Sequence, residues 1–457
     1  MSSNSEWWDL FAGVPLPIQV VFWVLVGLTS LSLVSLFAVL IAAAVNRARR
    51  KRTHAEGELT EEQLLWVFLV PALNEEITIA DSVQRLAEAH ATHSVIIAID
   101  DGSDDRTAQI LSQLDVPQLR VLRRELPSAR TGKAAALNAA YAYLREVVLK
   151  EPAFARWSPE TVIVAIIDAD GRLDAHAPEA VAWHFASATV GGVQTLVRIY
   201  NRRGWLTWAQ DVEFSGFGLA YQAGRSEWGT ANMGGNGQFN RLSALASVVV
   251  DAGPWRDRLT EDQDLGVRLI QAGWRGAQEN SVSIRQQGLS SLRKLYRQRT
   301  RWAQGAWQAL DLLPGVARTR SSIFGRVDAL FYLLTPLVQS LVGFAFLATI
   351  VLALVYQVPV VPKSFVFVVI FLVIGLAPIF FTLLLRGRGW IDVWQALLLI
   401  VPYAIYSWLI FPVLFAALIR EISGRTSWAK TAREPIRPQG DEAEGMWAGR
   451  EARGHSE

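Results

Sequence analysis

Long uncharged apolar stretches lie towards both ends of the chain. Ile18–Val45 is the first, and Ala329–Pro362, Ser364–Leu385 and Val393–Ile419 follow in the last third. A helix needs about 20 apolar residues to cross a bilayer. Each stretch is long enough, so the pattern predicts a membrane protein with up to four helical spans.

The basic residues beside these stretches predict the orientation of the chain. Asn46–Arg52 is strongly basic, which places this end of the first span in the cytoplasm and the amino terminus outside. Three later crossings would leave the carboxyl terminus outside, yet the tail after Ile419 is also basic. We therefore expect one stretch to form a hairpin or to lie on the membrane surface. Val393–Ile419 is the first candidate because it contains Pro402 and Pro412.

From about Gln63 to Gly276, short apolar runs alternate with helical stretches. The runs are rich in Val and Ile, as parallel strands covered on both faces are. The pattern predicts an α/β domain with a doubly wound sheet. The expected strands are Leu64–Val70, Val95–Ile99 and Val162–Ile167, and the expected helices are Ile77–Ala89, Lys133–Val148 and Pro178–Thr189.

Composition narrows the class of protein. Hydrophobic residues make up 51% of the chain and charged residues 19%, which excludes intrinsic disorder and disfavours an ordinary soluble enzyme. The 44 Lys and Arg nearly balance the 42 Asp and Glu, so we expect no nucleic-acid partner. The absence of cysteine excludes disulfides, thiolate zinc sites and a cysteine nucleophile. The six histidines are too scattered along the chain to suggest a metal cluster.

Two polar loops follow predicted strands at the edge where doubly wound sheets bind nucleotides. Their alternative role is that of turns and helix caps. A third candidate, Lys133, opens a helix after Gly132, where a lysine and free N–H groups suit a diphosphate; the alternative is a surface lysine. The candidate residues in the two loops are Pro71, Asn74, Glu75, Glu76, Asp100 and Asp101.

Asp168 and Asp170 follow an apolar run directly. Two carboxylates at a strand end can hold Mg²⁺ or Mn²⁺, which prefer oxygen ligands and leave positions open for phosphate oxygens. Such an ion would offset charge on a diphosphate leaving group. The alternative is a solvated acidic turn.

Thr260-Glu261-Asp262 precedes the helical segment Gln263–Ala272. Thr260 and Gln263 fit a capping box, with acidic residues in the first turn. Asp262 is also placed to act as a general base that takes a proton from an acceptor hydroxyl. The two roles are compatible, because a cap fixes the position of the carboxylate.

Leu289–Leu310 has the pattern of an amphipathic helix. Gln298, Arg301 and Trp302 share one face of it, where Arg301 can bind a diphosphate and Trp302 can stack on a sugar ring. The alternative is a basic helix on an anionic membrane. That alternative accounts for Arg293, Lys294, Arg297 and Arg299, but it does not need Gln298 or Trp302.

Four motifs occur in a fixed order: Asp100-Asp101, Asp168-Ala169-Asp170, Thr260-Glu261-Asp262 and Gln298-x-x-Arg301-Trp302. In this order they resemble the processive family-2 glycosyltransferases, which include the cellulose, chitin, hyaluronan and poly-N-acetylglucosamine synthases. The resemblance covers about Leu64 to Leu310 and implies a GT-A (Rossmann-like) cytoplasmic domain that transfers sugar with inversion. It implies that the two loops, Lys133, Asp168, Gln298 and Arg301 bind the nucleotide-sugar. It also implies that Asp168 and Asp170 hold the metal, that Asp262, with Glu261 beside it, is catalytic, and that Trp302 contacts the acceptor.

Two further segments fit the resemblance. Gly234–Gln238 lies where the family has an acceptor-contacting loop, which makes Gly235, Asn236 and Gln238 candidates; a plain flexible turn is the alternative. Ser427–Arg433 resembles a cytoplasmic segment of hyaluronan synthases that closes over the nucleotide. Its candidate lid residues are Trp428, Lys430, Thr431 and Arg433.

The sequence predicts a multi-pass enzyme of the cell membrane that extends a polysaccharide from a nucleotide-sugar. We expect no cyclic-dinucleotide-binding module after Ile419. The sugar stays open, with N-acetylglucosamine polymers favoured, and a partner subunit is possible. One alternative is single transfer onto a lipid or polyprenyl phosphate; another is a domain that only binds nucleotide. The expected divisions are 1–52 (first span and basic flank), 53–282 (catalytic domain), 283–322 (interface helices), 323–419 (spans) and 420–457 (tail, disordered at its end).

Overall fold

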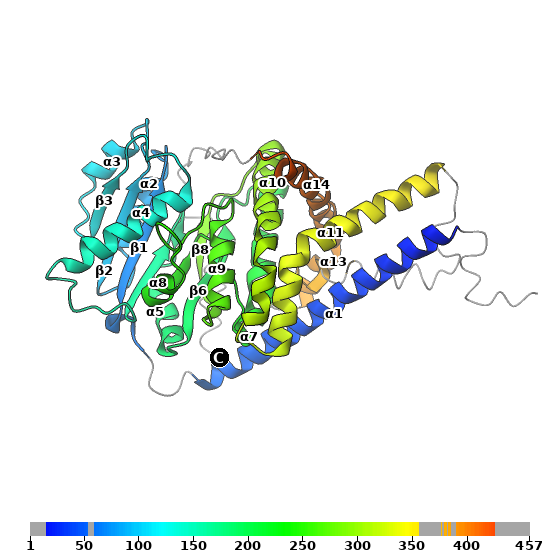
Figure 1. The fold of residues 1–457 in the computed structure, drawn as a ribbon, viewed down its shortest axis with the longest axis horizontal. Coiled ribbons are helices and arrows are strands. Elements are labelled where there is room, and N and C mark those ends of the chain that lie inside the picture. Colours follow the sequence, from blue (N-terminus) through cyan, green and yellow to red (C-terminus); the bar gives the residue numbers. More distant parts are fainter. Residues whose placement is uncertain are drawn as a thin grey trace, which may run out of the picture.

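The computed structural model describes residues 15–53, 59–355, 376, 379–381, 383–384 and 390–425. An α/β domain forms one end of the molecule, and long apolar helices project from the other (Figure 1). Together they have the predicted architecture of a catalytic α/β domain joined to helices that could span a membrane.

One mixed sheet of eight strands, in the order β3-β2-β1-β4-β7-β6-β8-β5, forms the centre of the α/β domain. The three predicted strands are confirmed as parallel neighbours, because β1 pairs in parallel with both β2 and β4. β7 runs antiparallel to both β4 and β6, so the sheet is mixed. The strands are β1 Leu65–Ala72, β2 Ser94–Asp100, β3 Leu119–Arg123, β4 Val162–Ile166, β5 Arg172–Leu173, β6 Val190–Ile199, β7 Gln238–Arg241 and β8 Arg275–Gln286.

Both faces of the sheet are covered by helices, which explains the unbroken apolar runs. Trp66 and Phe68 of β1 pack on the face covered by α2, α3 and α5. Val67 and Leu69 pack on the opposite face, with α4, α8 and α9. These helices are α2 Ile79–Ala87, α3 Thr107–Gln113, α4 Lys133–Glu146, α5 Ala177–Ala182, α8 Leu242–Ser247 and α9 Glu261–Gln271.

One predicted helix is wrong at its end. The pattern predicted Pro178–Thr189, but α5 ends at Ala182, a 3-10 helix continues over Trp183–Ala186, and the chain enters β6 at Val190. Gly191, the second residue of β6, lies beside Trp274, and a Cβ there would lie 2.7 Å from the Trp274 Cβ. Glycine is required by this close approach, and it conceals the strand in the sequence.

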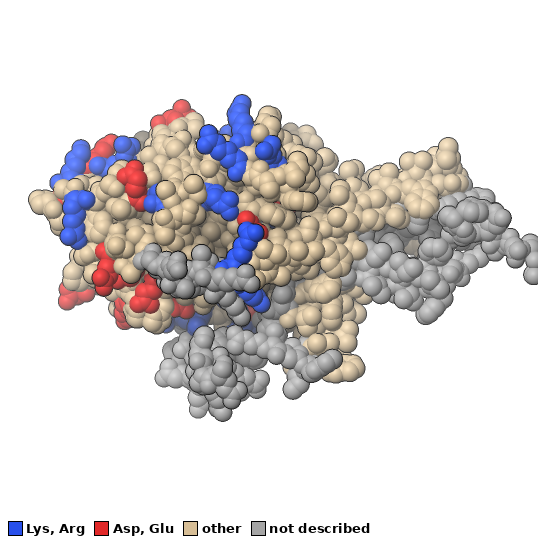
Figure 2. Space-filling model, turned by 90° about the horizontal axis from the view of Figure 1, so that it is seen from below, with Lys and Arg blue, Asp and Glu red and all other residues tan. Residues whose placement is uncertain are grey.

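Three stretches of the described residues are long and apolar enough to cross a membrane: Leu16–Arg49, Ile323–Ala345 and Val393–Ile422. They belong to α1 (Leu16–Thr53), α11 (Ile323–Val355) and the pair α13 (Trp390–Ser407) and α14 (Ile410–Ile422). Figure 2 shows charged side chains gathered over the α/β domain and nearly none on the described part of the projecting helices. The predicted span Ser364–Leu385 lies largely outside the described residues.

The last stretch breaks between α13 and α14, close to Pro412. Pro412 has no N–H to donate to the carbonyl of Trp408, four residues earlier. That carbonyl instead accepts from Phe411 N at 3.2 Å, and the helix is interrupted at Trp408–Leu409. Pro402, by contrast, lies inside α13.

The amphipathic helix predicted over Leu289–Leu310 is α10 (Leu292–Gln308). Its side chains pack on α14, where Ala303 meets Val413 and Leu414. Tyr296 Oη also donates to the carbonyl of Pro412 at 3.2 Å. Most of the apolar side of α10 is therefore covered by protein, with Leu292 left 56% exposed, and α10 joins the α/β domain to the projecting helices.

Candidate active site

A cavity of about 780 Å³ extends from the carboxyl ends of β1 and β4 to the projecting helices. It brings together residues from all four sequence motifs. Its lining includes Pro71, Glu75 and Asp101 at one end, then Lys133, Asp168, Gly235, Asn236, Glu261 and Asp262, then Gln298, Arg301 and Trp302, and finally Tyr332, Gln339, Tyr403 and Ser407.

The loop after β1 is held by the loop after β2. Asn74, with a positive φ of 53°, donates its N–H to Ser103 Oγ at 3.0 Å, and its side-chain oxygen accepts from Asp104 N at 3.0 Å. Glu76 pairs with Arg106 at 3.0 Å. Asn74 and Glu76 therefore brace the two loops, while Pro71 and Glu75 line the cavity.

The adjacent Asp100 and Asp101 have different surroundings. Asp100 is fully buried, and its Oδ1 accepts from Ser103 N at 2.9 Å, as in a turn. Asp101 lines the cavity and pairs with Arg124. Burial raises the pKa of Asp101 in spite of that arginine. Of the two, Asp101 is the one placed to meet a ligand.

Lys133, the first residue of α4, lies among carboxylates. Its Nζ is 2.6 Å from Asp168 Oδ1 and 3.6 Å from Glu261 Oε1. Burial lowers the pKa of this lysine, but the two carboxylates outweigh it and hold the pKa above its usual range. Lys133 is thus a fixed positive charge at the centre of the cavity.

Asp168 and Asp170 flank the turn after β4. Asp168 lines the cavity, whereas Asp170 is 3% exposed and its Oδ2 accepts from Gln287 N at 3.2 Å. Carboxylate oxygens are the donors that Mg²⁺ and Mn²⁺ prefer. The chemistry of this donor set fits such an ion.

Glu261 and Asp262 begin α9 and face the cavity. Burial, only partly offset by Lys133, raises the pKa of Glu261 to about 7 and also raises that of Asp262. The loop Gly234–Gln238, here called the glycine loop, lies against Asp262. A Cβ at Gly235, whose φ is +83°, would lie 2.7 Å from Asp262 Oδ2. Glycine is therefore required beside this carboxylate.

The predicted capping box is wrong in detail. The Thr260 hydroxyl makes no hydrogen bond to the backbone of the first turn; it donates to Gln263 Oε1 at 3.3 Å. Instead, Asp262 Oδ1 accepts from Gln263 N at 2.8 Å. The Thr260 side chain packs against Gly305 of α10, where a Cβ would overlap it.

The glycine loop is tied to the carboxylates. Asn236 Oδ1 accepts from Asp168 N at 3.0 Å, and its Nδ2 donates to Gln286 Oε1 at 2.9 Å. Gly235 and Asn236 line the cavity. Gln238 is buried in β7 and accepts from Gly235 N at 3.1 Å, so it supports the loop from behind.

Gln298, Arg301 and Trp302 all line the cavity, as their spacing predicts. Arg301 Nε is buried and has no hydrogen-bond partner among the described residues. A buried donor of this kind is expected to have a partner, and an anionic ligand in the cavity would supply one.

Arg299 is one of the four basic residues that the membrane-surface alternative accounts for, but it is buried within the protein. It is 7% exposed, and its Nη2 donates to Glu213 Oε2 at 2.6 Å. Its guanidinium carbon lies 4.2 Å from the centre of the Trp302 ring. Tyr406 of α13 donates to the same Glu213 carboxylate. Arg299 therefore links α10 to α13 and to α6 (Trp205–Gly216).

Sequence reasoning missed Arg124, Glu213, Arg299 and Tyr406, because their partners are distant in the chain. Glu213 and Arg299, for example, are 86 residues apart.

The expected lid residues Trp428, Lys430, Thr431 and Arg433 lie outside the described residues.

Comparison with known proteins identifies the family. The family profile described as "Glycosyltransferase like family 2" matches residues 66–305. A beta-monoglucosyldiacylglycerol synthase from Synechocystis is 33% identical over 248 residues, which are 53% of this chain and 47% of that protein. One from Trichormus variabilis is 29% identical over 319 residues, which are 68% of this chain and 64% of that protein.

A poly-beta-1,6-N-acetyl-D-glucosamine synthase from Staphylococcus aureus is 28% identical over 250 residues, which are 53% of this chain and 55% of that protein. The chain thus spans about half to two thirds of the length of these relatives.

A mannosyltransferase from Pyrobaculum calidifontis, solved with GDP-Man and Mn²⁺, has a similar fold: the TM-score is 0.52 at 17% identity, over 87% of this chain and 99% of that one.

Proposed function

Since the chain belongs to the family-2 glycosyltransferases, we propose that it transfers a sugar, with inversion, from a nucleotide-sugar to the hydroxyl group of a membrane lipid. The observation that carries this proposal is the continuous cavity. It joins the carboxylates at the edge of the sheet to Tyr332, Gln339 and Tyr403 on helices apolar enough to span a membrane. A donor entering at the sheet and an acceptor entering from the bilayer would meet beside Asp262.

The reaction needs a base, a place for the diphosphate and a fixed acceptor. Asp262 takes the proton of the acceptor hydroxyl, whose oxygen bonds to the anomeric carbon as the bond from that carbon to the diphosphate breaks. Lys133 and the unpaired Arg301 Nε offset the negative charge that leaves with the diphosphate. An α-linked donor then gives a β-linked product.

Asp168 and Asp170 would hold Mg²⁺ or Mn²⁺, since both offer carboxylate oxygens. When bound, such an ion supplies positive charge opposite the diphosphate. Asn236 keeps Asp168 in place through the backbone N–H of that residue.

The choice of a lipid acceptor rests on the relatives. Those named as beta-monoglucosyldiacylglycerol synthases match at 29–33% identity, and one match covers 68% of this chain. Glucose and diacylglycerol are therefore the first donor sugar and acceptor to test. The α/β domain is proposed to face the cytoplasm, because Asn46–Arg52 is basic and follows the first apolar stretch.

Processive polysaccharide synthesis is the second candidate. It is supported by the similarity to a poly-beta-1,6-N-acetyl-D-glucosamine synthase. The polar side chains of Gln339 and Ser407, in helices that could cross the bilayer, also line the cavity as a polymer path would require.

Product analysis separates the two candidates. Purified full-length protein in vesicles with and without diacylglycerol would receive radiolabelled UDP-glucose or UDP-N-acetylglucosamine, with Mg²⁺ or Mn²⁺. We expect label in a lipid carrying one sugar, only with diacylglycerol, and none with the Asp262→Asn variant. Label in a long water-soluble polymer would establish the second candidate. Equal transfer by the variant would refute the assigned base.

A further inference from the structure

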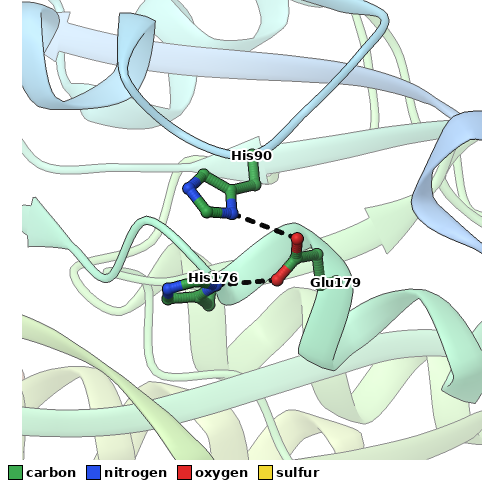
Figure 3. Close-up of side chains that lie close together, drawn as sticks. All are labelled: His90, His176 and Glu179. Atoms are coloured by element: carbon green, nitrogen blue, oxygen red, sulfur yellow. Dashed lines mark hydrogen bonds and ion pairs between the residues drawn. The ribbon is translucent and has the colours of Figure 1, made fainter.

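A cluster of metal-ligating side chains lies apart from the cavity. His90 follows α2, while His176 and Glu179 belong to the start of α5 (Figure 3). None of the three lines the cavity. The histidines are 86 positions apart in the sequence, and the fold gathers them. The expectation that the histidines are too scattered for a metal cluster is therefore wrong for this pair.

The three side chains converge on one point. His90 Nδ1 is 3.0 Å from Glu179 Oε1, and His176 Nδ1 is 2.8 Å from Glu179 Oε2. The two imidazole rings are 4.2 Å apart, centre to centre. One potential ligand atom from each residue lies within 4.8 Å of the others. Figure 3 shows both rings turned towards the same carboxylate.

The backbone fixes both segments that carry the cluster. His90 N donates to the carbonyl of Ala175 at 2.9 Å, which joins the segment after α2 to the residue before His176. His176 N donates to Asp174 Oδ1 at 3.1 Å. His176 and Glu179 are three residues apart at the first turn of α5, so their side chains share one side.

Two imidazoles and one carboxylate form a donor set suited to zinc and to similar transition metals. Bonds of about 2.0–2.2 Å in a tetrahedral site place neighbouring ligand atoms roughly 3.3 Å apart. The two distances from histidine to carboxylate, 3.0 and 2.8 Å, would widen slightly as an ion replaced the hydrogen bonds. The three ligand atoms, which all lie within 4.8 Å of one another, would then settle at about this spacing. Each imidazole could then carry its proton on Nε2.

We propose that His90, His176 and Glu179 form a binding site for a divalent transition-metal ion of the Zn²⁺ class. The ion ties the segment after α2 to α5. Side-chain exposures of 46% for His90, 62% for His176 and 48% for Glu179 leave water free to complete the coordination. The site is structural in its effect, because it lies outside the cavity and joins two segments of the α/β domain.

Zinc titration of chelator-treated full-length protein tests the site. Millimolar Mg²⁺ would be present throughout to occupy the Asp168 and Asp170 carboxylates. We expect one Zn²⁺ per chain at this site and a higher Tm with Zn²⁺. The His176→Ala and Glu179→Gln variants should each bind Zn²⁺ at least ~10-fold more weakly, and the rise in Tm should disappear.

His93→Ala is the matched control, because His93 is a nearby imidazole that packs on Trp157 outside the cluster. It should bind Zn²⁺ like the wild type. Donor hydrolysis by each variant verifies folding independently of Zn²⁺. If zinc binding and the Tm response were the same in His176→Ala, Glu179→Gln and the wild type, or if the wild type bound no zinc here, the site would not exist.

Discussion

At the scale of single residues, Glu261 and Asp262 show how neighbours in the sequence come to differ. Both are at the start of α9 and face the cavity, but Glu261 is 7% exposed and lies 3.6 Å from Lys133. Asp262 is less buried than Glu261 and lies against Gly235. Asp262 is therefore the better placed of the two to act as the base.

Replacing Asp262 with asparagine should remove the base and leave the donor site intact. We expect kcat to fall by roughly 10²–10⁴-fold, the contribution usual for general base catalysis, with little change in donor affinity. Transferase assays together with calorimetric donor binding measure both quantities. Asp115→Asn, at an exposed position outside the cavity, is the control and should have wild-type activity. An Asp262→Asn variant with near wild-type kcat would contradict the assignment.

The pH dependence of activity should reflect the burial of this pair. A base must be ionised to accept a proton, and burial raises the pKa of both Glu261 and Asp262, that of Glu261 to about 7. Activity should therefore fall as the pH drops from neutral. The acidic limb of kcat/KM should lie well above the ordinary aspartate value of about 3.9. A rate profile that stays flat down to pH 5 would argue against it.

At the scale of elements, α10 connects the cavity residues to the projecting apolar helices. Its Arg299 lies over Trp302 and bonds Glu213 of α6, and Tyr406 of α13 donates to the same carboxylate. Three elements distant in sequence thus fix the orientation of one tryptophan at the cavity. Arg299 therefore affects the reaction only through Trp302, by holding the indole ring in place.

The Arg299→Lys variant keeps the charge but loses the planar group that stacks on Trp302 and bonds Glu213. We expect acceptor kcat/KM to fall by about 10- to 100-fold through misplacement of Trp302, while the donor KM stays close to the wild-type value. Arg297→Lys tests the same change at an exposed position two residues away. Equal effects at the two positions, or a loss confined to donor binding, would refute the positioning role.

Elements with a clear periodic pattern were predictable, and those shaped by contacts were not. The apolar run of β1 and the face shared by Gln298 and Trp302 are visible in the sequence, and the structure has them. β6 was missed because glycines that make room for Trp274 and Met233 interrupt it. The pairing of Asp101 with Arg124 joins residues from different loops, and no local pattern encodes it.

At the scale of the whole molecule, one cavity crosses the boundary between the α/β domain and the projecting helices. Lys133 and Asp168 lie in the domain, and Gln339 and Ser407 lie in helices apolar enough to span a bilayer. Under the proposed function, a soluble donor enters at the sheet and a membrane acceptor enters between the apolar helices. The proposal therefore predicts that obstruction at the helical end of the cavity separates transfer from donor hydrolysis.

Ser407→Trp tests this separation, because Ser407 lines the cavity next to Tyr406 on α13. A bulky indole should obstruct the membrane end and lower transfer to the acceptor by at least ~10-fold. Slow hydrolysis of the donor by water should continue and shows that the variant is folded. Ile405→Trp adds the same side chain at a position that is 58% exposed and should transfer normally. If Ser407→Trp transferred sugar as well as Ile405→Trp, the acceptor would have to reach Asp262 by another route.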